Sequence, residues 1–147
     1  MSDYKPYHKK KKQVDSLSPF RLIEKGIARL IELIFPKGGF AVYPHGEISR
    51  IWNDVERTDP KLAIIEADKL VDSVLRRANI KGENFADRLR KVEKLVPYRT
   101  YQEMWDAHKV RNELVHEVGH DAHISNPDEV LRKIKNFLIA LGAFKNG

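Results

Sequence analysis

Three side chains near residue 110 have the types and spacing needed to bind and cleave a phosphate ester. Arg111, Asn112 and His116 fall in a predicted helix from Tyr101 to about Glu117 and share one side of it, bordering its apolar face. A guanidinium can stabilise the extra charge of a phosphoryl transition state, and an imidazole can move protons near neutral pH. Because Asn112 can position both groups, the three residues predict acid–base chemistry on a phosphodiester.

A structural role is the alternative for the same residues. On a helix drawn at about 100° per residue, Arg111 lies inside the apolar arc, where an unpaired charge is costly to bury. It would then pair with a carboxylate of an earlier helix, Asp68 or Asp72, and His116 would be a packed histidine. A stripe of partly apolar residues next to Arg111 would support either role: Trp105, His108, Asn112 and His116.

The end of this helix also contains a zinc-protease signature. His116-Glu117-Val118-Gly119-His120 matches H-E-x-x-H, in which the two histidines bind zinc and the glutamate activates water. His123 would be the third ligand. Against a zinc site, strand patterns are scarce in the chain, and Gly119 is typical of a helix end. A metallohydrolase therefore stands as a second alternative function.

The residues from Arg111 to His116 resemble the Arg-x4-6-His motif of HEPN domains, which are small helical bundles. A polar residue, often asparagine, follows the arginine in that motif, as Asn112 does here. The resemblance covers about residues 47–145 and rests on this one motif. Val118 stands where HEPN antitoxins often carry a tyrosine, which argues against a nucleotidylated-tyrosine role.

This resemblance implies a metal-independent endoribonuclease, or an RNA-directed toxin or defence protein, that acts as a homodimer. His116 would transfer protons, Arg111 would stabilise the phosphate and transition state, and Asn112 would position them. No cofactor is implied. A non-catalytic HEPN-like module for dimerisation or RNA binding is the first alternative.

The elements that must position these residues are helices, and strand-like alternation is nearly absent. The expected helices are residues 17–35, 47–56, 59–78, 84–96, 101–117 and 126–141. The fold class is therefore all-α, a bundle of five to six helices. In the helix that carries Arg111, the residues expected to face the core are Met104, Ala107, Val110, Leu114, Val115 and Val118. Both Trp52 and Trp105 are expected to be core residues.

Charge divides the 147 residues unevenly. Residues 1–12 carry +4 of the net charge of +6, because they hold one acid and five lysines: Lys5, Lys9, Lys10, Lys11 and Lys12. The last four are consecutive and form the predicted nucleic-acid-binding part of this segment. We expect a disordered basic tail over residues 1–16, an amphipathic helix over 17–35, a linker over 36–46 and the bundle over 47–145.

Two expectations about partners and location follow from these segments. The tail would bind RNA phosphates, and the amphipathic helix over residues 17–35 could contact a membrane surface. The absence of cysteine favours a reducing, cytoplasmic location.

Overall fold

The computed structural model describes residues 43–44, 46–116 and 124–144. This part of the chain is all-α and contains no strand, which confirms the predicted fold class. Its elements are α2 (Glu47–Glu56), α3 (Pro60–Arg77), α4 (Phe85–Lys91), the 3-10 helix η1 (Glu93–Leu95), α5 (Tyr98–His116) and α6 (Pro127–Ala140). The predicted tail and the predicted helix over 17–35 lie outside the described residues.

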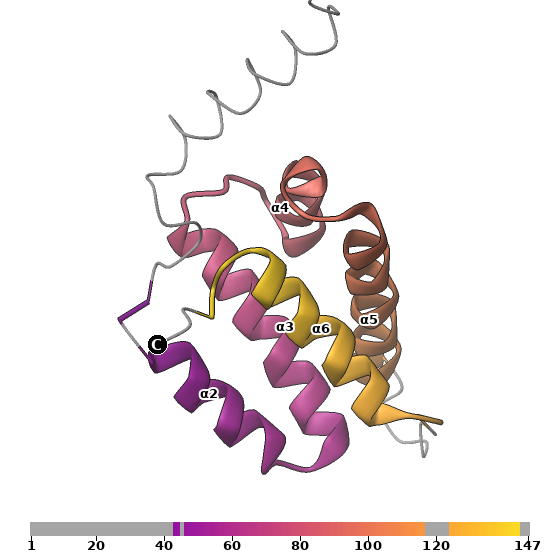
Figure 1. Cartoon of the computed structure of the whole chain (residues 1–147). Helices are drawn as coiled ribbons and strands as arrows, with labels where there is room; N and C mark the ends of the chain where they lie inside the picture. Colours follow the sequence, from indigo (N-terminus) through magenta and orange to yellow (C-terminus); the bar gives the residue numbers. More distant parts are fainter. Residues whose placement is uncertain (1–42, 45, 117–123, 145–147) are drawn as a thin grey trace, which may run out of the picture. The chain divides into compact units, whose positions relative to one another are not determined.

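Helix α3 is the centre of the bundle. It packs against α2, α4, α5 and α6, and α5 also packs along α6. Figure 1 shows α2, α3, α6 and α5 following one another across the view, with α4 at one end. None of the described helices combines the length and the apolar character needed to cross a membrane.

The helix starts follow side-chain caps that the sequence predicts. Asp59 accepts from the backbone N–H groups of Lys61 and Leu62 at 3.1 and 3.3 Å, and Pro60 occupies the first position of α3. Asn126 caps α6 in the same way, with Pro127 in the first position. These caps satisfy N–H groups that have no partner inside their own helix.

Two boundaries differ from the prediction. The expected helix over 84–96 ends at Lys91, and the 3-10 turn η1 follows it before Pro97. Helix α5 begins at Tyr98, three residues earlier than predicted. The carbonyl of Pro97 accepts the first helical hydrogen bond, from Tyr101 N at 3.0 Å, so the proline precedes the helix without interrupting it.

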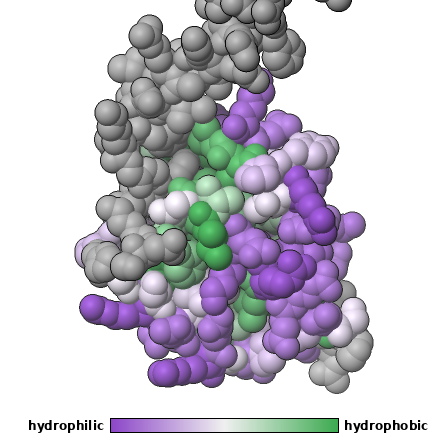
Figure 2. All heavy atoms as spheres, in the orientation of Figure 1, coloured by the Kyte–Doolittle hydropathy of each residue, from purple (hydrophilic) through white to green (hydrophobic). Residues whose placement is uncertain are grey.

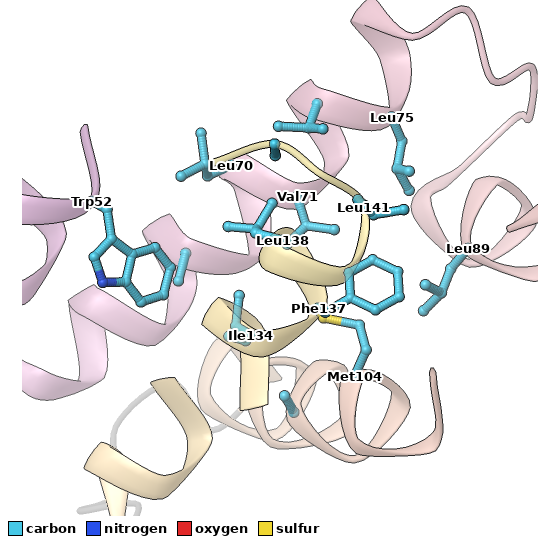
Figure 3. Close-up of a cluster of buried hydrophobic side chains, with 14 of the residues drawn as sticks. Trp52, Leu70, Val71, Leu75, Leu89, Met104, Ile134, Phe137, Leu138 and Leu141 are labelled. Atoms are coloured by element: carbon cyan, nitrogen blue, oxygen red, sulfur yellow. The ribbon is translucent and has the colours of Figure 1, made fainter. Parts of the chain in front are cut away.

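The core draws side chains from α2, α3, α4, α5 and α6, as Figure 3 shows. The largest fully buried side chains include Trp52, Leu75, Leu89, Met104, Ile134, Phe137 and Leu138. Trp52 is therefore a core residue, as predicted, whereas Trp105 is only partly buried at the core's edge. The prediction for Val115 is wrong: its side chain is exposed, next to the exposed His116 at the C-terminal end of α5. Val118 lies outside the described residues.

Candidate functional site

Helices α3 and α5 bring together four polar side chains. Asp68 is a buried residue of α3 with 3% of its surface exposed. Opposite it, α5 contributes His108, Arg111 and Asn112, whose spacing of three and four residues places them on one side of the helix. All four are among the residues for which the sequence predicts a catalytic or supporting role.

These side chains form a closed ring of contacts. Asp68 Oδ1 lies 2.9 Å from His108 Nδ1, and His108 Nε2 lies 3.2 Å from Asn112 Nδ2. Arg111 Nη1 donates to Asn112 Oδ1 at 3.0 Å. The ring closes where Arg111 Nε approaches Asp68 Oδ2 at 3.5 Å, the distance of an ion pair. We call these four residues the polar ring.

The hydrogen bonds of the polar ring match donors with acceptors from one residue to the next. An ionised carboxylate only accepts, so His108 donates through Nδ1–H to Asp68. Nε2 then accepts from the amide nitrogen of Asn112. The remaining charges, one on Asp68 and one on Arg111, offset each other within the fold.

Arg111 is held less completely than its partners. Its Nε atom is buried and makes no hydrogen bond with the described residues, although Asp68 Oδ2 lies 3.5 Å away. The Arg111 side chain as a whole is 26% exposed. The guanidinium is therefore held by one hydrogen bond from Nη1 to Asn112 and by the ion pair with Asp68, and part of the side chain stays exposed.

Aromatic rings surround the imidazole of His108. Phe85 of α4 lies against it with ring centroids 4.5 Å apart, and Trp105 approaches it edge-on at 6.1 Å. Arg90 of α4 lies over the other aromatic neighbour, 5.7 Å from the Trp105 ring centre. These contacts exclude water from part of the polar ring and hold His108 in one orientation.

The polar ring forms one wall of a cavity of about 260 Å³. The cavity is lined by Asp68, Lys69, Asp72, Ser73, Arg76, Phe85, His108 and Arg111. Sequence reasoning missed Lys69, Ser73, Arg76 and Phe85, because their proximity depends on how α3, α4 and α5 pack. The opening between these three helices gives a ligand access to Arg111.

Of the two carboxylates predicted to pair with Arg111, the structure selects Asp68. Asp72 instead binds Arg88 at 2.7 Å and Arg76 at 2.9 Å. Arg88 is a second buried arginine, with 4% of its surface exposed, and it also donates to the carbonyl of Gly82. The sequence holds a signal for Arg88, since it lies next to Leu89 and one turn from Phe85, on the inward side of α4.

His116 does not join the polar ring. It is the last residue of α5 and is exposed, so the alternative of a packed histidine is wrong. Arg111 and His116 are five residues apart, which is a rotation of roughly 140° around a helix, so the prediction that they share one side of α5 is wrong. Within the described residues, the imidazole nearest to Arg111 in the hydrogen-bond network belongs to His108, and Asn112 links the two.

Most residues of the predicted zinc site lie outside the described part of the chain. Glu117, His120 and His123 are not among the described residues. Within the described ranges, no three His, Asp or Glu side chains are grouped so that they could hold a metal ion.

The tail lysines predicted to bind nucleic acid also lie outside the described residues, so the structure places none of them beside the polar ring. They are Lys9, Lys10, Lys11 and Lys12. The cations that the structure does place at the cavity are Lys69, Arg76 and Arg111.

Comparison of the chain with models of known families, with curated proteins and with solved structures finds no match. Its function must therefore be inferred from the site itself.

Proposed function

We propose that this chain is a HEPN-like domain that binds RNA and cleaves it as a homodimer without a metal ion. The observation that carries the proposal is the anchoring of Arg111. Asp68 and Asn112 hold its guanidinium at the wall of an open cavity, and a quarter of its side chain remains exposed. An anchored, planar guanidinium with an exposed end is suited to gripping two phosphate oxygens.

The homodimer supplies what one chain lacks. His116 is exposed on α5 and is rotated away from Arg111 of its own chain. Two copies of α5 that approach across a twofold axis would place the His116 of one protomer beside the Arg111 of the other. In this arrangement each composite site has a cation for the phosphate and an imidazole for the proton.

The reaction is an internal transfer within the RNA. One His116 imidazole accepts the proton of a ribose 2′-hydroxyl, and the 2′ oxygen forms a bond to the adjacent phosphorus. The bond from phosphorus to the 5′ oxygen breaks, and that oxygen takes the proton back from the same His116, which is then in its imidazolium form. Arg111 stabilises the charge on the non-bridging oxygens. The products are a 2′,3′-cyclic phosphate and a 5′-hydroxyl end.

Cleavage of a structured RNA pool by three variants tests this proposal. His116→Asn should leave the melting temperature unchanged and lower the rate about 10²–10⁴-fold, because proton transfer is lost. Arg111→Lys keeps the charge but loses the planar fork, so it should also lose most activity. Glu113→Gln, an exposed change on the same helix, is the matched control. Wild-type cleavage by His116→Asn, or cleavage abolished by EDTA, would overturn the assignment.

Sedimentation tests the composite site separately. A dimer should form at tens of micromolar, an order of magnitude chosen for a weak interface. A monomer at that concentration in a protein that still cleaves RNA would exclude the shared site.

A second candidate function, a non-catalytic HEPN-like binding module, is favoured by one observation. The ion pair with Asp68 already neutralises Arg111 inside the fold. In such a module, Arg111 would stabilise the bundle and RNA would bind without being cut. RNA binding that persists with no cleavage under any metal condition would select this function.

A further inference from the structure

We propose that two adjoining cavities on either side of Arg76 bind two consecutive nucleotides of a single-stranded RNA. This inference rests on RNA as the ligand of the proposed function, and it assigns residues outside the Arg111–His116 motif. The first cavity is the one beside the polar ring. The second, of about 340 Å³, is lined by Arg76, Asn79, Ile80, Lys81, Gly82, Glu83 and Arg88. Because Arg76 lines both cavities, they lie next to each other.

The exposed charges around the first cavity favour an anion. The side chains of Lys69 and Arg76 are 58% and 65% exposed. The two carboxylates of the same cavity lie deeper, since Asp68 is 4% and Asp72 is 20% exposed. All four groups have partners within the fold: Asp68 pairs with Arg111, Asp72 with Arg88 and Arg76, and Lys69 with Glu66. The two sets therefore differ in exposure and not in pairing. A ligand that enters therefore meets cations first, as a phosphate group requires.

Phe85 provides the surface for a base. It is partly buried, it lines the first cavity, and its ring already packs against His108 at 4.5 Å. Single-stranded nucleic acids bind by laying bases on aromatic rings while cations follow the backbone. A base against Phe85 would place its phosphate toward Arg111 or Arg76. The volume of 260 Å³ suits one such unit, since it lies just below the range for drug-sized ligands.

The second cavity continues the predicted RNA-binding surface of the first. Three of its lining residues are cations, Arg76, Lys81 and Arg88, against one acid, Glu83. Arg88 is buried and committed to Asp72 and Gly82, whereas Arg76, whose Nε also pairs with Asp72, is exposed and reaches a ligand together with Lys81. An RNA strand that spans both cavities would thus place the phosphate that joins its two nucleotides against the guanidinium of Arg76. The chain around these cavities, residues 76–99, has eight lysines and arginines and three acids.

The shape of the second cavity depends on a tight loop. Asn79 adopts a left-handed backbone conformation, with φ of 62°. Gly82 lies so close to α4 that an added Cβ would be 2.9 Å from the backbone nitrogen of Arg88. The hydrogen bond from Arg88 to Gly82 O then fixes the loop to the helix. The wall that carries Lys81 is therefore anchored to the core.

Binding of AMP and of a short 2′-O-methyl oligoadenylate to the full chain tests the proposal. The oligonucleotide has no free 2′-hydroxyl, so it binds without being cleaved. Arg76→Met should weaken oligonucleotide binding about tenfold and lower its salt dependence by about one phosphate contact, a slope change of about 0.7. Arg77→Met removes the same charge from the neighbouring residue, which lies over Tyr43 outside both cavities, and is the matched control.

Two further variants separate the cavities. Phe85→Leu should weaken both AMP and the oligonucleotide about tenfold, as expected for the loss of one base stack. Lys81→Met should weaken the oligonucleotide and leave AMP unchanged. Thermal unfolding checks that Phe85→Leu is folded, and the exposed Arg76→Met gives an independent result if it is not. Equal losses in Arg76→Met and Arg77→Met would overturn the proposal, because binding would then depend on charge alone.

These binding experiments test the two cavities separately from RNA cleavage, the proposed function. If the oligonucleotide binds with this pattern but unmodified RNA is never cut, the paired cavities stand and the cleavage proposal fails. If RNA is cleaved while Phe85→Leu and Arg76→Met bind and cleave like wild type, the cavities are not the RNA path and cleavage stands.

Discussion

The polar ring gives Arg111 two roles at once. Its charge is balanced by Asp68 within the fold, and its outer end is available at the cavity. A phosphate that binds Arg111 must therefore compete with a carboxylate 3.5 Å from Nε. Because Nε makes no hydrogen bond, the carboxylate of Asp68 competes less strongly with the phosphate. The same arginine can thus hold α5 against α3 and still bind an anion.

Asp68→Asn is the sharpest test of the polar ring as a structural element. The substitution keeps the shape of the side chain but removes the anion that faces Arg111 and His108. The nitrogen of the new amide would also face a donor, either His108 or Arg111. We expect the free energy of unfolding to fall by about 2–4 kcal/mol, the range for a buried charge deprived of its partner. Denaturant unfolding measures the loss.

Asp106→Asn is the control for this change. Asp106 lies on α5 as well, but its side chain is 70% exposed and its ion pair with Lys133 is 3.9 Å long. It should change stability by less than about 0.5 kcal/mol. Equal effects of the two substitutions would show that Asp68 has no special role.

At this scale the sequence limits the partner of Arg111 to Asp68 or Asp72 and does not predict the whole ring. An arginine inside an apolar arc requires a carboxylate, and Asp68 lies on the facing side of α3. That His108 and Asn112 link the two depends on side-chain rotamers, which spacing alone does not determine. The exposure of His116 is not predictable either, because Val115 and Val118 suggest that the apolar face continues to the end of the helix.

Between elements, one charged contact joins α2 to α6. Lys135 donates to Glu56 Oε1 at 3.0 Å, and the indole N–H of the buried Trp52 donates to the same oxygen. Lys135 also lies 5.4 Å from the centre of the Trp52 ring. The hydrogen bond from Lys135 and then that from Trp52 lower the pKa of Glu56 below its usual value of 4.5, against the opposing effect of burial.

This contact predicts a pH-dependent contribution to stability. A lowered pKa means that the unfolded chain takes up the Glu56 proton more readily than the folded chain. The stabilisation is therefore complete above about pH 4.5 and is lost as the pH falls through the folded value. Glu56→Gln should lower the melting temperature at pH 7, and its difference from wild type should shrink at about pH 3. A difference that stays constant with pH would contradict the assignment.

The helices themselves are largely predictable because their signals are local. Asp59-Pro60 and Asn126-Pro127 each combine a cap with a first-turn proline, and α3 and α6 begin there. The start of α5 is not predictable from Pro97 alone, since a proline can either end one helix or precede the next. A proline precedes a helix when its carbonyl accepts the first helical hydrogen bond. Here the carbonyl of Pro97 accepts that bond from the N–H group of Tyr101.

Across the whole molecule, positive charge is concentrated in two segments. Residues 1–12 carry a net +4 and residues 76–99 a net +5, so the rest of the chain is slightly acidic. Figure 2 shows apolar residues across the middle of one face, with hydrophilic residues beside and below them. Assigning the charge mainly to the tail misses the second basic segment. That segment supplies the lining of the second cavity and contributes Arg76 and Phe85 to the first, whereas the tail lies outside the described residues.

Deletion of residues 1–12 distinguishes the roles of these two segments. The deletion removes five lysines, so the slope of log affinity against log salt for single-stranded RNA should decrease by up to about 3.5. Binding at low salt should persist, because residues 76–99 remain, and the cleavage rate at saturating RNA should be unchanged. Titrations of the intact and shortened chains over a range of salt concentrations measure both effects. If the shortened chain binds RNA at low salt but no longer cleaves it, the tail contributes to the chemistry and its purely electrostatic role is wrong.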